Sequence, residues 1–245
     1  MVDRLFADAC LARVYDVWHP REVRDDYDFY LPRIMAAPSV LDVGCGTGTL
    51  LVEARDAGHL GRLYGLDPAS GMLDRARLRL DIEWALGELP SAGWTAEFDL
   101  IVMTGHAFQA IVEDEALERF LIAVREALVP GGRFGFDTRN PLARAWEQWR
   151  PENAVTIRGL DGCEVQITTE VVEPFDGRTV TFTHTFDGAH TSLPQVSQST
   201  LRFLDADTLE HFLTRVGLRI EKQFGDFAGN VLSSSSPEIV TIAVA

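Results

Sequence analysis

The sequence predicts an α/β protein built on a doubly wound, seven-stranded, mostly parallel sheet that carries an inserted antiparallel β-sheet. From Val40 onward, short apolar strands alternate with amphipathic helical segments, which is the pattern of parallel βαβ units. After Trp149 the hydrophobic period changes to two residues, and near Asp205 the helical period returns. We expect the 245 residues to form one domain. Its parts are a helical cap (1–38), a core (39–150 and 205–245) and a β insert (151–204).

The cap is expected to be helical, with aromatic side chains interleaved among charged ones up to Pro38. One core helix, over about 113–128, has apolar residues at three- and four-residue spacing, and Pro130-Gly131-Gly132 stops it. The core strands are expected at about 39–44, 61–67, 82–86, 98–104 and 132–138.

The insert is expected to be a four-stranded antiparallel sheet. Apolar positions alternate over 165–171 and again over 180–186, and Asp176-Gly177 forms the turn between these strands. Strands at about 154–160 and 195–204 complete the sheet. Trp146 and Trp149, which precede the insert, are expected to pack under it, or else to line the pocket, and His184 is expected to be a core residue rather than a ligand.

The core resumes with a helix that begins at a capping-box-like pair, Asp207 and Glu210, and ends at Gly217. Two further strands, about 218–226 and 238–244, are close enough in sequence to pair as a hairpin. The last of them is expected to run antiparallel to the rest of the sheet.

Charge and composition limit the classes of partner. A net charge of −15, from 37 acidic and 22 basic side chains, disfavours nucleic acid and anionic lipid as partners. No apolar run approaches the roughly 18 residues that span a bilayer, and the N-terminus lacks the layout of a secretory signal. Cys10, Cys45 and Cys163 form neither a disulfide framework nor a zinc spacing. We expect a cytoplasmic protein that acts on a small molecule. The sequence does not indicate its oligomeric state.

A glycine-rich loop joins the first core strand to the helix after it. Gly44, Gly46 and Gly48 stand at alternate positions, where the missing Cβ lets the backbone turn tightly and approach a ligand. The dinucleotide fingerprint Gly-x-Gly-x-x-Gly is not met, because residue 49 is Thr. Asp42 would repel a pyrophosphate but attract a ligand with an ammonium and a sulfonium. Two alternatives stay open: an ordinary strand–helix turn, and an Asp42 that only hydrogen-bonds the loop.

This loop and four later segments resemble, in order and spacing, the motifs of the class I S-adenosylmethionine-dependent methyltransferases, whose fold is Rossmann-like. The resemblance covers nearly the whole chain, and it implies transfer of a methyl group from S-adenosylmethionine to N or O of a small-molecule acceptor by direct displacement. The inserted sheet resembles the one that small-molecule N-methyltransferases place over their pockets. The five segments are Val40–Gly48, Tyr64–Asp67, Gly87–Leu89, Phe98–Val102 and Leu128–Arg133.

The resemblance also implies a set of cofactor-binding residues. Asp67 would accept hydrogen bonds from both ribose hydroxyls, and Pro68 through Met72 would shape the adenine side. Met72 and Leu89 could instead be ordinary core residues, and Cys45 would contribute its backbone N–H. The implied set is Asp42, Gly44, Cys45, Gly46, Gly48, Asp67, Pro68, Met72, Gly87, Glu88, Leu89 and Met103.

Candidates for the acceptor side lie where strands four and five end and in the cap. His106 is the candidate general base because imidazole titrates near neutral pH, although a structural histidine is an equal alternative. Arg139 and Asn140 are expected to face the substrate mouth. Tyr27 and Tyr30 are expected to close one side of the acceptor pocket, or else only to anchor the cap to the sheet.

Two other functions remain open on the sequence alone. A protein of the same fold could bind the cofactor without transferring its methyl group, because the family has no universal catalytic residue. A nicotinamide-dependent oxidoreductase is less favoured because of the glycine spacing and Asp42. Position 104 is Thr, where metal-dependent catechol-type enzymes have Asp, so we expect no metal.

Overall fold

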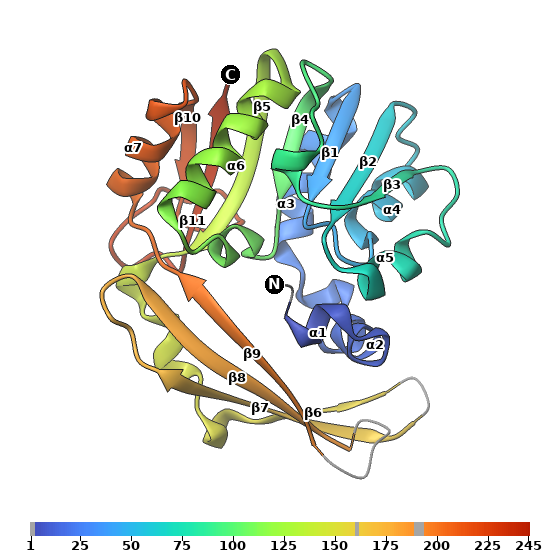
Figure 1. The fold of residues 1–245 in the computed structure, drawn as a ribbon, viewed down its shortest axis with the longest axis vertical. Coiled ribbons are helices and arrows are strands. Elements are labelled where there is room, and N and C mark those ends of the chain that lie inside the picture. The colour runs from blue at the N-terminus through green and yellow to red at the C-terminus, as the bar shows by residue number, and fades with distance from the viewer. Residues whose placement is uncertain (1–2, 160–161, 189–193) are drawn as a thin grey trace.

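The computed structural model describes residues 3–159, 162–188 and 194–245. A seven-stranded sheet forms the centre of the core, with strand order β10-β11-β5-β4-β1-β2-β3 (Figure 1). β11 pairs antiparallel with both β5 and β10, whereas the pairs among β1 to β5 are parallel, as the sequence predicts. The strands are β1 Ser39–Val43, β2 Arg62–Asp67, β3 Glu83–Leu86, β4 Phe98–Met103, β5 Leu128–Arg139, β10 Arg219–Phe224 and β11 Glu238–Val244.

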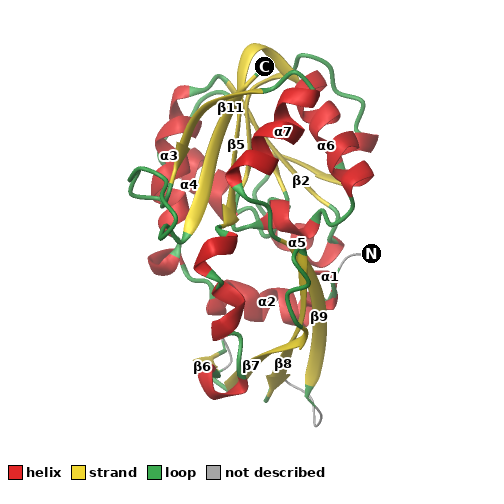
Figure 2. Ribbon diagram, turned by 90° about the vertical axis from the view of Figure 1, so that its left-hand side faces the viewer, coloured by secondary structure: helices red, strands yellow, loops and turns green. Residues whose placement is uncertain are grey.

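Helices cover both faces of this sheet (Figure 2). Successive residues of β4 show the alternation: Leu100 and Val102 belong to the apolar cluster under α3 and α4, and Ile101 to the cluster under α6 and α7. Strands buried on both faces therefore appear in the sequence as continuous apolar runs. The helices are α3 Asp25–Ala36, α4 Thr49–Asp56, α5 Ser70–Ala76, α6 Asp114–Ala127 and α7 Ala206–Arg215.

The start of β5 and the cap of α7 differ from the sequence prediction. β5 begins at Leu128, directly after α6, so the Pro130-Gly131-Gly132 segment lies inside the irregular start of the strand. α7 is capped by Asp205, whose side chain accepts a hydrogen bond from the Thr208 N–H, and not by Asp207. Both differences arise at helix ends, where the hydrophobic period carries no information.

The insert is a four-stranded antiparallel sheet of order β6-β7-β8-β9, which confirms the prediction. β9 ends at Arg202, two residues short of the predicted end, and the predicted strand end at residue 160 lies outside the described residues. Figure 1 shows this sheet extending away from one edge of the core. Its strands are β6 Val155–Arg158, β7 Glu164–Glu173, β8 Thr179–Asp187 and β9 Gln195–Arg202.

The first two helices, α1 (Arg4–Ala7) and α2 (Ala9–Trp18), join the insert to the core. Leu11 belongs to an apolar cluster with Ile167 and Phe186 of the insert, whereas Ala12 belongs to a cluster with Met72 of α5. The cap therefore packs on both sheets at once.

The segment between β5 and the insert consists of short 3₁₀ turns, and its tryptophans pack under the insert as predicted. Trp146 stacks on Phe175 at 4.4 Å between ring centroids, and Trp149 lies 4.5 Å from Phe182. Among the described residues, no helix has the length and apolar character needed to cross a bilayer.

Candidate active site

The carboxyl ends of the parallel strands face the cap and the insert (Figure 1). In open α/β sheets this edge is where ligands bind. The glycine loop leaves β1 here, His106 follows β4, and β5 ends at Arg139. Because β11 runs the other way, its first residue, Glu238, lies at the same edge and pairs in register with Arg139.

Each glycine of the loop adopts a left-handed conformation, with φ of +72° at Gly44, +56° at Gly46 and +78° at Gly48. A Cβ at Gly48 would lie 2.3 Å from the Trp84 ring, so that glycine is needed for packing. A Cβ at Gly46 would meet no atom within 4 Å, so the loop presents open backbone there. The Cys45 N–H donates to the Leu66 carbonyl at 3.3 Å, and that carbonyl also accepts from the Gly44 N–H at 2.8 Å, so contact of the Cys45 N–H with a cofactor stays a prediction.

Asp67 ends β2 beneath this loop and is oriented by two backbone donors. Its Oδ2 accepts from the Gly46 N–H at 2.8 Å, and its Oδ1 accepts from the Ala69 N–H at 2.7 Å. A carboxylate has about four acceptor positions, so each oxygen keeps one for a further donor. Burial raises the pKa of Asp67, and the two N–H donors oppose that shift.

Asp42 is a buried carboxylate on β1 that the protein leaves unsatisfied. It is only 1 % exposed, and its Oδ1 has no hydrogen-bond partner among the described residues. The glycine loop therefore does not satisfy this oxygen, which answers the alternative raised from the sequence. Burial, reinforced by nearby Asp67, raises the pKa of Asp42 to about 7. A ligand cation beside Asp42 would relieve this cost.

A cavity of about 200 Å³ lies between the glycine loop and the N-terminal segment. Tyr27 lines it, together with Tyr15, His19 and Arg24, which the sequence analysis did not single out. These residues precede the first motif, and the crowding of aromatic side chains in the cap was the only signal for them.

Arg24 is held firmly in this wall. Its Nε and Nη2 donate to the two oxygens of Asp26 at 2.9 and 2.6 Å, and its guanidinium lies 4.1 Å from the centre of the Tyr27 ring. The third nitrogen, Nη1, has no hydrogen-bond partner among the described residues. The geometry leaves that N–H pair available to an anionic group in the cavity.

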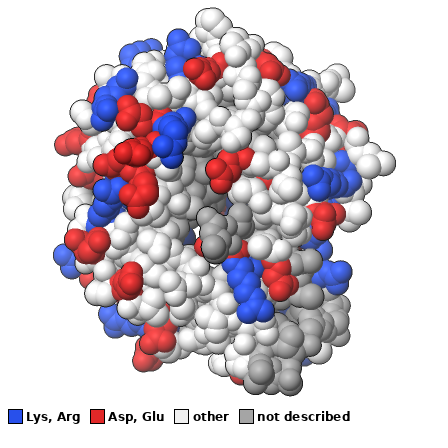
Figure 3. Space-filling model, in the orientation of Figure 1, with Lys and Arg blue, Asp and Glu red and all other residues white. Residues whose placement is uncertain are grey.

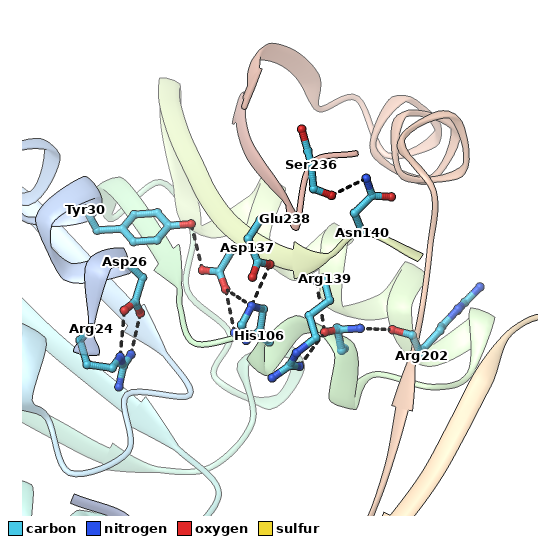
Figure 4. Close-up of polar contacts among 11 residues, drawn as sticks. Arg24, Asp26, Tyr30, His106, Asp137, Arg139, Asn140, Arg202, Ser236 and Glu238 are labelled. Atoms are coloured by element: carbon cyan, nitrogen blue, oxygen red, sulfur yellow. Dashed lines mark hydrogen bonds and ion pairs between the residues drawn. The ribbon is translucent and has the colours of Figure 1, made fainter. Parts of the chain in front are cut away.

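A second polar cluster surrounds His106 (Figure 4). His106 Nε2 lies 2.9 Å from Glu238 Oε2, and the His106 backbone N–H donates to Asp137 Oδ2 at 2.8 Å. The other oxygen of Asp137 accepts from the Tyr30 hydroxyl at 3.2 Å. Asp137 thus links α3 to the loop that follows β4.

Arg139 lies beside this cluster and contacts no carboxylate at ion-pair distance among the described residues. Its Nη1 donates to Gln109 Oε1 at 3.0 Å, and its guanidinium lies 5.5 Å from the centre of a Trp149 ring. Burial lowers the pKa of Arg139, whereas Glu238 and Asp137 raise it. Arg139 is thus held by the neutral side chain of Gln109 and by an aromatic ring. A guanidinium in these surroundings is suited to orient a substrate that carries a negative or polar group.

Two residues expected in the acceptor pocket have structural roles instead. Asn140 is 3 % exposed, its amide donates to the carbonyls of Ser233 and Ser236, and its oxygen accepts from the Leu142 N–H. Tyr30 is completely buried and serves Asp137, so it anchors the cap to the sheet and does not line the pocket. For Tyr30 this is the second of the two alternatives that the sequence left open. For Asn140 the expectation was wrong, because sequence position gives the strand end but not the direction of the side chain.

The remaining predicted cofactor residues lie near the ends of β2, β3 and β4. Met72 and Leu89 are buried in apolar clusters, at 1 % and 2 % exposure, and Met103 is 7 % exposed. Pro68 and Glu88 are exposed, and the Gly87 N–H donates to the Asp67 carbonyl. Their contact with a cofactor stays a prediction.

Acidic groups outnumber basic ones in this region. The cations Arg24 and Arg139 are fewer than the carboxylates of the region. Burial lowers the pKa of His106 to about 3 and of His19 to about 4, so both imidazoles are neutral. Burial raises the pKa of Asp137 to about 6 and of Glu238 to about 7. This balance favours a positively charged ligand. The carboxylates are Asp26, Asp42, Asp67, Asp137 and Glu238.

Comparison with known proteins gives consistent results. Residues 40–132 match the family model described as a methyltransferase domain. A cypemycin N-terminal methyltransferase from Streptomyces sp. is 26 % identical over 208 residues, which cover 83 % of this chain and 82 % of that protein. A 2-phytyl-1,4-naphtoquinone methyltransferase from Thermosynechococcus vestitus is 33 % identical over 118 residues, 46 % of this chain and 51 % of that protein.

Two solved structures show the same fold over nearly the whole chain. The CcbJ methyltransferase from Streptomyces caelestis superposes with a TM-score of 0.75 at 20 % identity, covering 96 % of each chain. CalS10 from Micromonospora echinaspora, an amino pentose methyltransferase solved with S-adenosylmethionine bound, gives a TM-score of 0.70 at 19 % identity, with 94 % of this chain and 96 % of that chain covered.

Proposed function

We propose that this chain is a class I S-adenosylmethionine-dependent methyltransferase that methylates a nitrogen or oxygen atom of a small-molecule acceptor held between His106 and the insert. The similarity to methyltransferases sets aside the nicotinamide-dependent oxidoreductase. Measured turnover distinguishes an enzyme from a protein that only binds the cofactor. Different residues support the cofactor site and the acceptor pocket.

The observation that carries the cofactor proposal is the unsatisfied carboxylate oxygen of Asp42. A buried charge without a partner is costly, so its persistence points to a cationic ligand. The open backbone at Gly46 leaves room for that ligand above the loop, and Asp67 retains acceptor capacity for a vicinal diol. These residues fit S-adenosylmethionine, which carries an ammonium, a sulfonium and a ribose.

The cap completes this site in our proposal. The free Nη1 of Arg24 would bind the carboxylate of the amino-acid moiety, and Tyr15 and Tyr27 would close the cavity from the side of the cap. His19 is neutral because burial lowers its pKa, so it adds no positive charge beside the sulfonium.

When bound, S-adenosylmethionine supplies an electrophilic methyl group, and the protein has to align the acceptor with it. Positioning of this kind contributes roughly 7–11 kcal/mol to the lowering of a barrier. The side chains that would confine the acceptor are aromatic. The ring centroids of Trp18 and His184 are 4.8 Å apart, and those of His184 and Phe182 are 5.0 Å apart. Phe182 in turn packs against Trp149. Arg139, above Trp149, would orient a polar group of the acceptor.

The acceptor class is a second part of the proposal. The excess of buried carboxylates supports an acceptor that arrives as a cation, such as an amine. The cypemycin enzyme is named for an N-terminal reaction and CalS10 for an amino pentose, which supports amines as the first compounds to test.

The test combines binding with turnover. Calorimetry should show micromolar binding of S-adenosylhomocysteine and none of NAD. Incubation with S-adenosylmethionine and a panel of aminosugars, short peptides and matched hydroxy compounds should then give S-adenosylhomocysteine, detected by mass spectrometry, with the amines preferred. If the protein binds the cofactor but methylates none of the compounds in the panel, the proposed acceptor class is contradicted. Failure to bind the cofactor would overturn the cofactor site itself.

A further inference from the structure

We propose that Glu238 is a positioning residue that fixes the tautomer of His106, so that the Nδ1 atom of the imidazole receives the proton that the methyl acceptor releases. This rests on the proposed function of the site. No motif or pattern in the sequence singles out Glu238, which lies 132 residues from its partner.

The contact is a consequence of strand direction. β4 and β5 end at the edge of the sheet that carries the candidate site. β11 is antiparallel to them and therefore begins at that edge. His106 and Glu238 thereby meet at 2.9 Å between Nε2 and Oε2, as Figure 4 shows. The side chains are 19 % and 16 % exposed, so the pair is neither sealed in the core nor free in solvent.

The backbone of His106 is held as firmly as its ring. The residue adopts a left-handed conformation, with φ of +63°, which is uncommon for a residue other than glycine. Its N–H donates to Asp137, and Asp137 is held in turn by the Tyr30 hydroxyl. Strain of this kind persists only where the surroundings determine the conformation, and here they aim the imidazole at Glu238.

The hydrogen bond decides which nitrogen is basic. A neutral imidazole has one N–H donor and one acceptor nitrogen, and an ionised carboxylate only accepts. With Glu238 ionised, Nε2 therefore carries the hydrogen and Nδ1 carries the lone pair. Nδ1 has no hydrogen-bond partner among the described residues. It is absent from the fully buried polar atoms that lack a partner, so it is accessible to solvent or to a ligand.

Burial keeps the imidazole neutral, so Nδ1 retains its lone pair. Burial lowers the pKa of His106, Arg139 and Arg24 lower it further, and Asp137 and Asp26 oppose them. Burial raises the pKa of Glu238 to about 7, Asp26 adds to this, and Arg139 opposes it. Below pH 7 the carboxyl group is therefore protonated and donates to Nε2, which moves the ring hydrogen to Nδ1 and removes the base.

The proton then has a defined path during transfer. The acceptor's N–H or O–H bond breaks and Nδ1 takes the proton, while the acceptor's electron pair forms the bond to the methyl carbon. The carbon–sulfur bond breaks with its electrons remaining on sulfur. Ionised Glu238 stabilises the imidazolium until its proton passes to water.

The first test observes the tautomer directly and requires no acceptor. The full chain, labelled with ¹⁵N-histidine and saturated with S-adenosylhomocysteine, is studied by long-range ¹H–¹⁵N correlation spectra, with the His106 signal assigned by its loss in His106→Asn. We expect hydrogen on Nε2 at pH 8 and a change toward Nδ1 as the pH falls through about 7. In Glu238→Ala the ring should show both tautomers and no change near pH 7. Hydrogen on Nδ1 at pH 8 in the wild type, or an unchanged tautomer in Glu238→Ala, would overturn the proposal.

The second test is kinetic, with the best amine from the acceptor panel. Glu238→Gln keeps the size of the side chain but cannot ionise, so kcat at pH 8 should fall on the order of 10²-fold and the rise of kcat with pH near 7 should disappear. Glu238→Asp should recover part of both. Glu221→Gln on β10, which removes a surface carboxylate paired with Arg133, is the matched control and should keep the wild-type profile.

Measurements on the same samples distinguish damage to the fold from failure of the proposed function. Tm and S-adenosylhomocysteine affinity should be close to wild type in Glu238→Gln. If kcat falls only in proportion to the folded fraction, Glu238 is structural and the proposal fails. If the wild type shows the expected tautomer yet no compound is methylated, the positioning stands and the acceptor class is at fault.

Discussion

Two aspartates beside the glycine loop differ in the hydrogen bonds that their carboxylate oxygens accept. Asp67 receives two backbone N–H donors that orient its carboxylate, whereas Asp42 has an oxygen with no partner among the described residues. Asp42 therefore carries an energetic cost that a cationic ligand can remove, and Asp67 is a preformed acceptor for a neutral ligand group. The two residues should respond differently to mutation.

We predict that Asp42→Asn stabilises the ligand-free protein at high pH. The pKa of Asp42 in the folded state is about 7, above the ordinary 3.8, so the folded protein binds more protons than the unfolded chain between these values. Wild-type stability therefore falls as the pH rises from about 4 to 7, by at most about 4 kcal/mol from this residue. Asparagine does not titrate, so Tm should exceed wild type at pH 8 and match it near pH 4. The same variant should bind S-adenosylmethionine more weakly. A lower Tm at pH 8 would contradict this account.

For Asp67 the effect should appear in binding. Asp67→Ala removes the acceptor proposed for the ribose hydroxyls and should weaken S-adenosylhomocysteine binding by roughly 1.5–3 kcal/mol, the range for hydrogen bonds to a charged group. Isothermal calorimetry measures this. Asp56→Ala, at the exposed end of α4, is the control and should bind normally. Unchanged affinity in Asp67→Ala would remove the ribose assignment.

His106→Ala tests the proton acceptor. If Nδ1 removes the acceptor proton, kcat should fall by roughly 10²–10⁴-fold while cofactor affinity stays nearly intact. His211→Ala, on the exposed side of α7, controls for loss of a histidine as such. A variant that loses stability but keeps its turnover per folded molecule would show that His106 is structural.

At this scale the sequence predicted some site residues and missed others for a physical reason. Asp67 ends a buried strand within a motif, so its position at the carboxyl edge of the sheet could be inferred. Arg24 and Glu238 lie outside the motifs and reach the site only through the packing of α3 and the position of β11 within the sheet. Asn140 was placed at the correct edge but turned toward Ser236.

At the level of elements, hydrophobic period located nearly every helix and strand, and helix ends were the least certain. The predicted start of α7 chose Asp207, but Asp205 has the extended backbone and the hydrogen bond to Thr208 that define an N-cap. Both acids precede the same apolar face, so the pattern alone does not distinguish them.

This difference is measurable. Asp205→Ala should lower the free energy of unfolding by about 1 kcal/mol because the Thr208 N–H loses its acceptor. Asp207→Ala should cost less, since Asp207 only adds favourable charge to the first turn. Urea denaturation of the two variants makes the comparison. Equal losses would restore the capping role that the sequence suggested for Asp207.

For the molecule as a whole, the sequence predicted the topology, including the reversed last strand and the separate insert. It could not predict that α1 and α2 fill the space between the two sheets, since their apolar residues are compatible with either one. Figure 3 shows acidic and basic side chains interspersed over one face of the molecule. The acidic excess to which we assign a role in cofactor binding lies inside the molecule, at the carboxyl ends of the parallel strands.

Because the proposed cofactor site joins the loop of the core to the cap, its ligand should stabilise the entire fold. S-adenosylhomocysteine at 100 times its Kd should add about 2.7 kcal/mol, or a rise of roughly 5–11 °C in Tm for a chain of this size. NAD at the same concentration should have no effect. Differential scanning fluorimetry checks both, and stabilisation by NAD would contradict the interpretation of the glycine loop.

The position of β11 has a consequence for the order in which this protein is made. β10 lies at the edge of the sheet and reaches β5 only through β11, although it leaves the ribosome first. It has no strand to pair with until β11 emerges and inserts between the two. The five strands that carry the proposed cofactor residues can assemble before then, but Glu238 arrives with the strand that completes the sheet. On our proposal, the growing chain therefore acquires the ability to hold its methyl donor before the ability to use it.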